Sequence, residues 1–158
     1  MLRSKDLNII EKKTRTQILN QKSLSGGDIN NLYLLETTTL PLVVKSNSIA
    51  DFPNMFEYEK KGLEKLKQTK SIQIVDTINQ INHNDLSFLI LNYIKTSPET
   101  SEFWEKFGLQ LNQLHQTQSI SFGLDTPNYI GSLPQQNNWC TTWTEFYVTQ
   151  RLEPQLKK

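Results

Sequence analysis

A glycine turn between two short apolar segments is the feature that most constrains the fold. The turn is Ser25-Gly26-Gly27-Asp28, and residues 18–24 and 29–37 flank it. Glycine supplies the backbone conformations that tight turns need, and β-forming residues on both sides indicate strands. The pattern predicts a hairpin, and residues 40–45 add a third strand in a meander.

Helical and strand-like segments follow in an order that predicts an α+β fold. Pro53 can begin a helix, and apolar residues recur at helical spacing over residues 53–68. The isoleucines of residues 72–78 and the apolar run of residues 88–91 predict a fourth and a fifth strand, separated by a turn. The expected result is a five-stranded antiparallel sheet with one helix inserted after the third strand.

The composition changes after Ile94, where Thr96-Ser97-Pro98 breaks the strand. A helix with an apolar stripe from Phe103 to Leu114 is expected next, and another helix at about residues 141–152. Residues 116–138 contain several Gly and Pro and predict a long irregular connection. We therefore expect two parts, residues 1–95 and residues 96–158.

Charge and cysteine content exclude several classes of protein. The 158 residues carry 17 Lys and Arg against 16 Asp and Glu, a net charge of +1, so a nucleic-acid partner is not expected. Cys140 is the single cysteine, which excludes an intramolecular disulfide and a multi-cysteine metal site. No apolar stretch approaches the ~18 residues that a membrane span needs. We expect a cytoplasmic chain with no membrane partner.

A lysine and a glutamate follow the glycine turn in an order that suggests a phosphate-binding site. Lys45 ends the third predicted strand, and Glu59 lies on the next helix. An ammonium beside a carboxylate, near a turn that exposes backbone N–H groups, can orient a nucleotide triphosphate. Taken singly, the turn is more often a plain hairpin turn and the two charges solvated side chains. Their order favours the functional interpretation.

Longer motifs carry a resemblance to a known family. They are Ser25-Gly26-Gly27-Asp28-Ile29-Asn30, Val43-Val44-Lys45-Ser46-Asn47, Phe88-Leu89-Ile90-Leu91-Asn92-Tyr93, Asn128-Tyr129-Ile130-Gly131-Ser132-Leu133-Pro134-Gln135 and Arg151-Leu152-Glu153-Pro154-Gln155. With them the chain resembles the fructosamine kinase (ketosamine-3-kinase) family, which is related to aminoglycoside phosphotransferases and choline kinases within the protein-kinase-like fold. The resemblance begins near residue 23 and implies that residues 1–95 form an ATP-binding small lobe with its hinge. Residues 96–158 would then begin the helical large lobe.

The resemblance also implies roles for single residues. Gly26 and Gly27 would lie over the ATP phosphates, and Lys45, held by Glu59, would contact the α- and β-phosphates. The hinge that meets adenine would be formed by Leu91, Asn92, Tyr93 and Ile94. Two tryptophans are weaker candidates for a sugar site, with helix packing an equal alternative: Trp139 and Trp143.

The family reaction would be ATP-dependent phosphorylation of the 3-hydroxyl of a fructosamine or ribulosamine, a step in protein deglycation. Its catalytic motifs, His-Gly-Asp-Leu-Trp-x-Gly-Asn and Asp-Pro-Ala, do not occur in this sequence. We therefore expect no catalytic residue and no metal ligand in this chain, with Mg²⁺ bound by a missing C-terminal part, and an inactive isolated chain. The expected partners are ATP and a ketosamine or glycated protein, with self-association through residues 98–152.

Other classes of function stay open on the sequence. One is a non-catalytic nucleotide-binding or interaction module, and another is a kinase of the same fold that acts on aminoglycosides or choline. The stretch from Asn128 to Arg151 argues against the second. An unrelated α+β binding domain is the least specific alternative.

Overall fold

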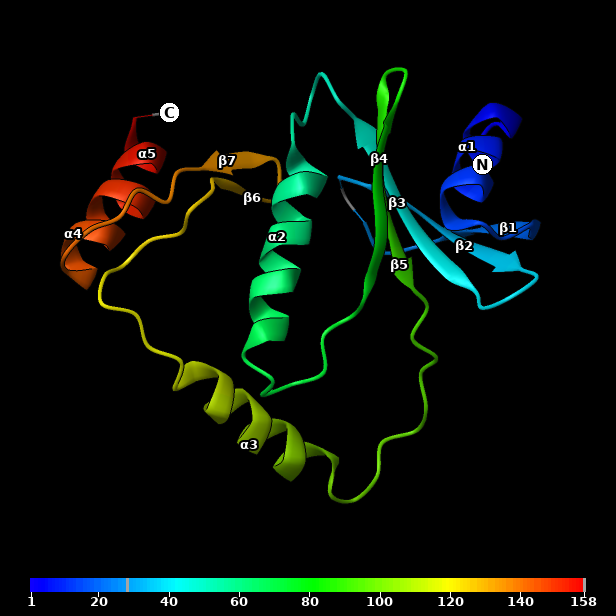
Figure 1. The fold of residues 1–158 in the computed structure, drawn as a ribbon. Coiled ribbons are helices and arrows are strands. Elements are labelled where there is room, and N and C mark those ends of the chain that lie inside the picture. Colours follow the sequence, from blue (N-terminus) through cyan, green and yellow to red (C-terminus); the bar gives the residue numbers. More distant parts are fainter. Residues whose placement is uncertain (28, 158) are drawn as a thin grey trace. The chain divides into compact units, whose positions relative to one another are not determined.

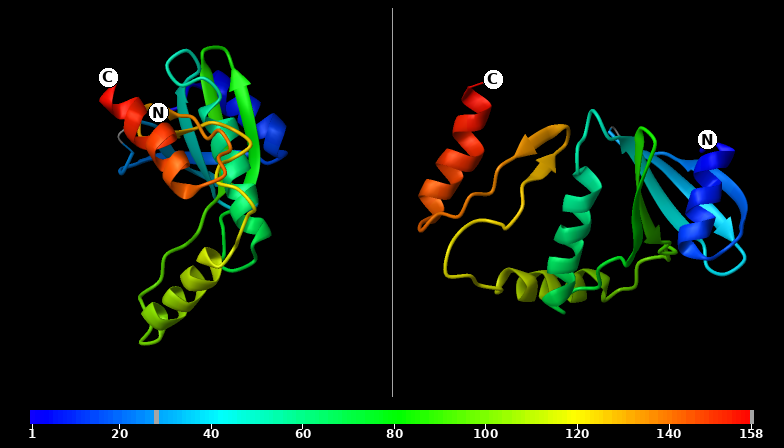
Figure 2. Two further views of the ribbon diagram at one scale, coloured as in Figure 1. Left: turned by 90° about the vertical axis from the view of Figure 1, so that its left-hand side faces the viewer. Right: turned by 45° about the horizontal axis from the view of Figure 1, so that its top comes forward.

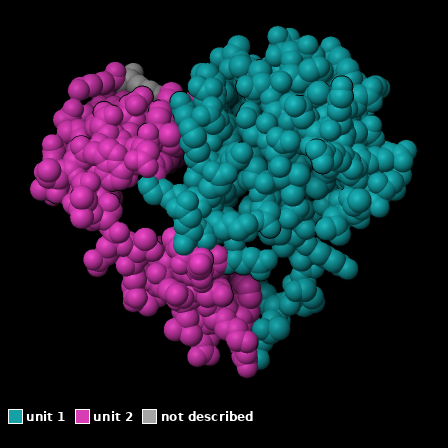
Figure 3. Space-filling view, viewed as in Figure 1, with its two compact units in different colours: residues 1–68, 73–101 teal, residues 69–72, 102–158 magenta. Residues whose placement is uncertain are grey.

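The computed structural model describes residues 1–27 and 29–157, so Asp28, at the end of the predicted turn, lies outside the described residues. The chain forms two compact units, residues 1–68 with 73–101 (unit 1) and residues 69–72 with 102–158 (unit 2) (Figure 3). The elements of unit 1 are α1 (Ser4–Thr14), β1 (Ile18–Leu24), β2 (Asn31–Thr37), β3 (Leu42–Ser48), α2 (Met55–Gln68), β4 (Thr77–His83) and β5 (Leu86–Asn92). The elements of unit 2 are α3 (Phe103–His115), β6 (Asn128–Ile130), β7 (Leu133–Gln135), α4 (Trp143–Tyr147), the π-helical turn η1 (Val148–Leu152) and α5 (Glu153–Leu156).

Unit 1 is built on one antiparallel sheet with the strand order β1-β2-β3-β5-β4 (Figure 1). This confirms the predicted five-stranded sheet with a helix after the third strand. Strand β3 lies in the centre and pairs with both β2 and β5, so Lys45 stands opposite Leu32 on one side and Leu89 on the other. The central strand therefore carries the lysine that the sequence singled out.

Helix α1 covers one face of this sheet and closes the main core. Its Ile10 is fully buried, and the core combines residues from the helix and from four strands: Leu2, Ile10, Tyr33, Leu35, Leu42, Val44, Ile81, Phe88 and Ile90. The side chain of Gln21 on β1 also accepts a hydrogen bond from the Leu2 N–H at 2.9 Å and donates one to the Leu2 carbonyl at 3.1 Å. The N-terminal segment is thus a structural part of unit 1.

A buried carboxylate also holds α1 to the sheet. Asp6 is 1% exposed, accepts a hydrogen bond from Arg3 Nε at 2.8 Å, and lies 3.4 Å from Nδ1 of His83 at the end of β4. Burial opposes ionisation of Asp6 and is the largest single influence. The hydrogen bonds from Arg3 and His83, together with the Arg3 charge, outweigh burial and hold the pKa of Asp6 below its ordinary value.

Helix α2 lies on the opposite face of the sheet. Neighbouring residues of a strand point to opposite faces, so Lys45 faces away from the core that contains Val44. Met55 and Phe56 in the first turn of α2 are buried and lie near β3: the Phe56 ring centre is 5.8 Å from the Lys45 ammonium. The face under α2 therefore mixes apolar packing with polar groups.

The fourth strand begins later than the sequence predicted. Ile72 and Ile74 lie outside β4, whose pairing with β5 starts with Thr77 opposite Leu91. Strand β5 ends one residue beyond Leu91, so no partner backbone is left for the earlier isoleucines. The prediction of a strand from residue 72 is wrong for this reason.

Unit 2 departs from the prediction in two places. The connection over residues 116–138 contains a short hairpin, β6 and β7, which turns at Gly131 with a φ of 60°. The predicted helix at 141–152 begins at Trp143 after Thr142, whose hydroxyl accepts a hydrogen bond from the Glu145 N–H at 3.2 Å. Figure 2 shows α4, η1 and α5 as one continuous rod.

No helix within residues 1–27 and 29–157 is long and apolar enough to cross a membrane. The predicted division into residues 1–95 and 96–158 concerns functional lobes and stays a prediction.

Candidate functional site

Lys45 and Glu59 form a close ion pair on the α2 face of the sheet. The Lys45 ammonium donates to both carboxylate oxygens of Glu59, at 2.7 and 2.8 Å. The side chains are 21% and 30% exposed, so the pair is reached by solvent but largely enclosed. The expected pairing of these two residues is present, and their role in binding ATP stays a prediction.

Local structure explains why the two charges meet. Lys45 lies on the central strand between the cross-strand neighbours Leu32 and Leu89, which flank it on both sides. Glu59 stands three and four residues after Phe56 and Met55, on the same face of α2. The Phe56 ring, at 5.8 Å, adds a cation–π contact to the ammonium. The ammonium is thus fixed from the helix side and can act as a point charge.

Gly26 and Gly27 have backbone geometry that suits a tight turn. Gly26 has a φ of 116°, a value that residues with a side chain rarely adopt. Gly27 lies close to the residue that precedes β2, because a Cβ atom at this position would lie 2.5 Å from the Asn30 carbonyl oxygen. Both glycines are exposed. Their backbone can therefore approach a ligand closely.

The predicted hinge lies at the end of β5, and its first amides are already occupied. The Asn92 N–H donates to the Asp76 carbonyl at 3.0 Å, and the Tyr93 N–H donates to the Pro41 carbonyl at 3.2 Å. Within the described chain, the Ile94 N–H is the first amide of this segment without a hydrogen-bond partner. The hinge backbone is therefore held on both sides as far as Tyr93 and becomes available at Ile94.

The two candidate tryptophans, both in unit 2, occupy different surroundings. The Trp139 ring packs on the backbone of Gly123, where an added Cβ would lie 2.9 Å from ring carbons. Trp143 is 56% exposed, stacks on Tyr147 with ring centres 5.5 Å apart, and borders a hollow. That hollow is lined by Thr117, Gln118, Ser119, Ser121, Phe122, Gly123, Trp143 and Phe146. Trp139 thus packs on one side although it is 45% exposed, and Trp143 keeps an open face beside hydroxyl groups. A role of either residue in a sugar site stays a prediction.

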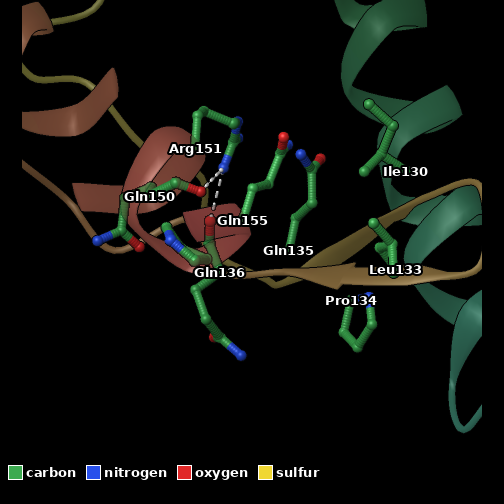
Figure 4. Close-up of a pocket in the computed structure, with 9 residues that line it drawn as sticks. Ile130, Leu133, Pro134, Gln135, Gln136, Gln150, Arg151 and Gln155 are labelled. Carbon is green, nitrogen blue, oxygen red and sulfur yellow. Dashed lines mark hydrogen bonds between the residues drawn. The ribbon is translucent and has the colours of Figure 1, made fainter. Parts of the chain in front are cut away.

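A smaller hollow of about 60 Å³ lies beside Arg151 in unit 2 (Figure 4). The guanidinium donates to the carbonyls of Gln136 at 2.8 Å and Gln150 at 2.9 Å, and to Oδ1 of Asn137 at 2.6 Å. It also lies 4.7 Å from the Phe146 ring centre. These internal bonds tie η1 to the segment after β7, so Arg151 supports the packing of unit 2.

Comparisons with known proteins agree on one family. A model of the fructosamine kinase family matches residues 1–158. A probable ketoamine kinase of Vibrio parahaemolyticus is 38% identical over 89% of this chain and 49% of its own length. The chloroplastic protein-ribulosamine 3-kinase of Arabidopsis thaliana is 34% identical over 94% of this chain and 46% of its own length.

Solved structures give the same result. A candidate fructosamine-3-kinase from Haemophilus somnus superposes with a TM-score of 0.86 at 26% identity, over 96% of this chain and 52% of the other. A second, from Thermobifida fusca, gives 0.79 at 27% identity with the same coverage. The chain thus spans about half the length of the relatives it matches, and its unit 1 has the small-lobe fold that the sequence predicted.

Sequence reasoning did not single out two polar residues next to Lys45. Asn30 follows the glycine turn and Asn47 follows Lys45 on β3, and their side chains are hydrogen-bonded at 3.1 Å. Each asparagine is the last residue of a motif quoted above, and this was the available signal. Only the register of β2 and β3 brings the two side chains within hydrogen-bond distance.

Proposed function

Because the chain belongs to the fructosamine kinase family, we propose that it forms the ATP-binding part of a kinase that phosphorylates the 3-hydroxyl of a ketosamine. The substrate would be a fructosamine or ribulosamine carried by a small amine or a glycated protein. The names of the relatives, ketoamine kinase and protein-ribulosamine 3-kinase, support this substrate class. The observation that carries the proposal is the enclosed pair of Lys45 and Glu59.

The residues of unit 1 fit the binding of a nucleotide triphosphate. Glu59 keeps the Lys45 ammonium in one place, where it would contact the α- and β-phosphates. The backbone of Gly26 and Gly27 would cover the phosphates, since no side chain blocks the approach. The adenine edge would meet the hinge at the Ile94 N–H and at carbonyl oxygens of the preceding residues. Bound ATP supplies the phosphoryl group, and Mg²⁺ neutralises its charge.

The remaining catalytic groups are proposed to lie in a part of the family fold that this chain does not span. No three His, Cys, Asp or Glu side chains gather into a metal site within the part of the chain that the structure describes. The chain covers 49% of the Vibrio parahaemolyticus relative. We expect the catalytic Asp and the metal-binding Asp in the other half, and hence no phosphorylation by the isolated chain.

Titration calorimetry with ATP tests the assignment of Lys45. The chain should bind ATP weakly, and Lys45→Ala should weaken binding by at least about tenfold, or about 1.4 kcal/mol. Lys61→Ala is a matched control, because Lys61 lies on α2 and pairs with Glu57 at 2.7 Å but stands 47% exposed. Tight Mg²⁺-dependent binding that Lys45→Ala leaves unchanged would contradict the assignment.

A chimaeric enzyme tests the reaction and the substrate class. Residues 1–158 would be joined to the second half of the Vibrio parahaemolyticus relative and assayed with a fructosamine, a ribulosamine, choline and an aminoglycoside. We expect phosphorylation of the ketosamines alone, lost in Lys45→Ala. Preferred turnover of choline or an aminoglycoside, or turnover by the isolated chain, would refute the proposal.

A further inference from the structure

A buried asparagine stands two residues after Lys45 on the same face of β3. Asn47 is 4% exposed, so its amide is removed from solvent. Its Nδ2 lies 3.2 Å from the sulfur of Met55 in the first turn of α2, the helix that also carries Glu59. Asn47 therefore lies where β3 and α2 meet, next to the ion pair.

The same Nδ2 reaches the end of the glycine turn. It donates to Oδ1 of Asn30 at 3.1 Å. The backbone of Gly27 lies against the Asn30 carbonyl oxygen: a Cβ on Gly27 would lie 2.5 Å from that oxygen. Fixing Asn30 therefore limits where Gly27 can move. One side chain thus contacts both the turn and the helix.

The other end of the Asn47 amide is unsatisfied. Its Oδ1 is buried and has no hydrogen-bond partner among residues 1–27 and 29–157. A buried acceptor without a donor costs about 1–3 kcal/mol, comparable to what one hydrogen bond contributes. Asn47 is therefore a poor choice for the stability of unit 1 alone, and a leucine of similar size would fill the space without that cost.

We infer that Asn47 is a positioning residue for the phosphate site: its bond to Asn30 holds the glycine turn in register with Lys45 on β3 and with Glu59 on α2. This inference rests on the proposed function, because the turn and the lysine act together only if both meet the phosphates of one nucleotide. Asn47 acts through Asn30 and does not itself touch the ligand.

Two substitutions in the 158-residue chain remove the bond from its two ends. Asn47→Leu replaces the buried amide, and Asn30→Ala removes its half-buried partner, which leaves the Asn47 Nδ2 with the Met55 sulfur alone. Each should weaken ATP binding about tenfold and leave adenosine binding unchanged. Asn47→Leu should not lower the thermal midpoint by more than a degree or two, whereas Asn30→Ala should lower it by several degrees, because it strands a buried donor. Because both remove one bond, the double variant should lose no more ATP affinity than either single variant.

Relaxation of backbone ¹⁵N nuclei gives a readout that needs no nucleotide. In both variants the order parameters of Gly26 and Gly27 should fall towards the flexible range, below about 0.6. The matched control is Ser87→Ala. Ser87 pairs with Asn47 across β3 and β5 and is equally buried, but its hydroxyl bonds to Asn82 instead of the turn. This variant should change neither ATP affinity nor the order parameters.

The possible results separate this inference from the proposed function. If ATP binding depends on Lys45 but is unchanged in Asn47→Leu and Asn30→Ala, the positioning role is refuted and the proposed function stands. In Asn47→Leu, equal losses of ATP affinity, adenosine affinity and thermal midpoint would show that the role of Asn47 is structural only. If the unsubstituted chain binds no ATP, the proposed function and this inference both fail.

Discussion

Unit 1 and unit 2 differ in how far they bury their own apolar side chains. Unit 1 buries residues from α1 and from four strands in one continuous core, in which Ile10, Leu35, Val44 and Phe88 are fully enclosed. In unit 2 the buried apolar residues among those described are Cys140 and Phe146, and α3 contains none. The unit that carries the proposed nucleotide site is therefore held by its own core, whereas α3 in unit 2 leaves large apolar side chains exposed.

The largest expected effect comes from emptying the core of unit 1. Phe88→Ala should cost about 3–5 kcal/mol, because it removes a fully buried ring and leaves a cavity. The same change in unit 2, Phe103→Ala, should cost less than about 1 kcal/mol, since Phe103 is 40% exposed. Urea unfolding followed by circular dichroism measures both. Equal losses would mean that unit 2 has a core as effective as that of unit 1.

The exposed aromatic residues of α3 should drive self-association of the chain through residues 98–152. Trp104 is 65% exposed, and its ring centre lies 6.3 Å from that of Phe107. Exposed apolar patches of this kind favour association. Light scattering should show oligomers that dissociate in Trp104→Gln/Phe107→Gln. Leu40→Gln, which changes a 71% exposed side chain outside residues 98–152, should leave them intact. A monomeric unsubstituted chain at high concentration would contradict the prediction.

The contact of α1 with the sheet should depend on pH through Asp6. Since the pKa of Asp6 is lower in the folded chain than its ordinary 3.8, its charge stabilises unit 1 above that value. This stabilisation is lost as the pH falls through the folded pKa. At neutral pH Asp6→Asn should lower the thermal midpoint by several degrees, and the difference should shrink below about pH 4. Glu57→Gln, at a half-exposed surface pair, should show little change at either pH.

The smallest expected effect is local to unit 2. Arg151→Lys keeps the charge but cannot reproduce the fork of bonds to Gln136 and Asn137. The amide of Leu124, which donates to the Asn137 carbonyl at 3.0 Å, should then exchange about tenfold faster, or 1.4 kcal/mol. Unfolding of unit 1 should not change. Unaltered exchange would show that Arg151 does not hold this segment.

Much of the fold was predictable because neighbouring residues determine it. The glycine turn, the strand patterns on either side and the helical spacing after Pro53 gave the sheet and α2 nearly as they are. The start of β4 was missed because isoleucines favour strands wherever they occur, while a strand needs a partner. The pairing of β4 with β5 runs from His83 to Thr77, and Ile72 and Ile74 lie beyond it.

By itself the sequence determined the local conformations, because side-chain size, glycine freedom and hydrophobic spacing act within a few residues. Its motifs carried the resemblance to the family. Through the resemblance to this family the sequence also implied that Glu59 holds Lys45. Only the tertiary structure decided which distant side chains meet: Asn47 with Asn30, 17 residues apart, and Asp6 with His83, 77 residues apart. It also decided which hinge amides are occupied. These contacts depend on strand register and on how helices pack against the sheet, and neither is fixed by any short stretch of sequence.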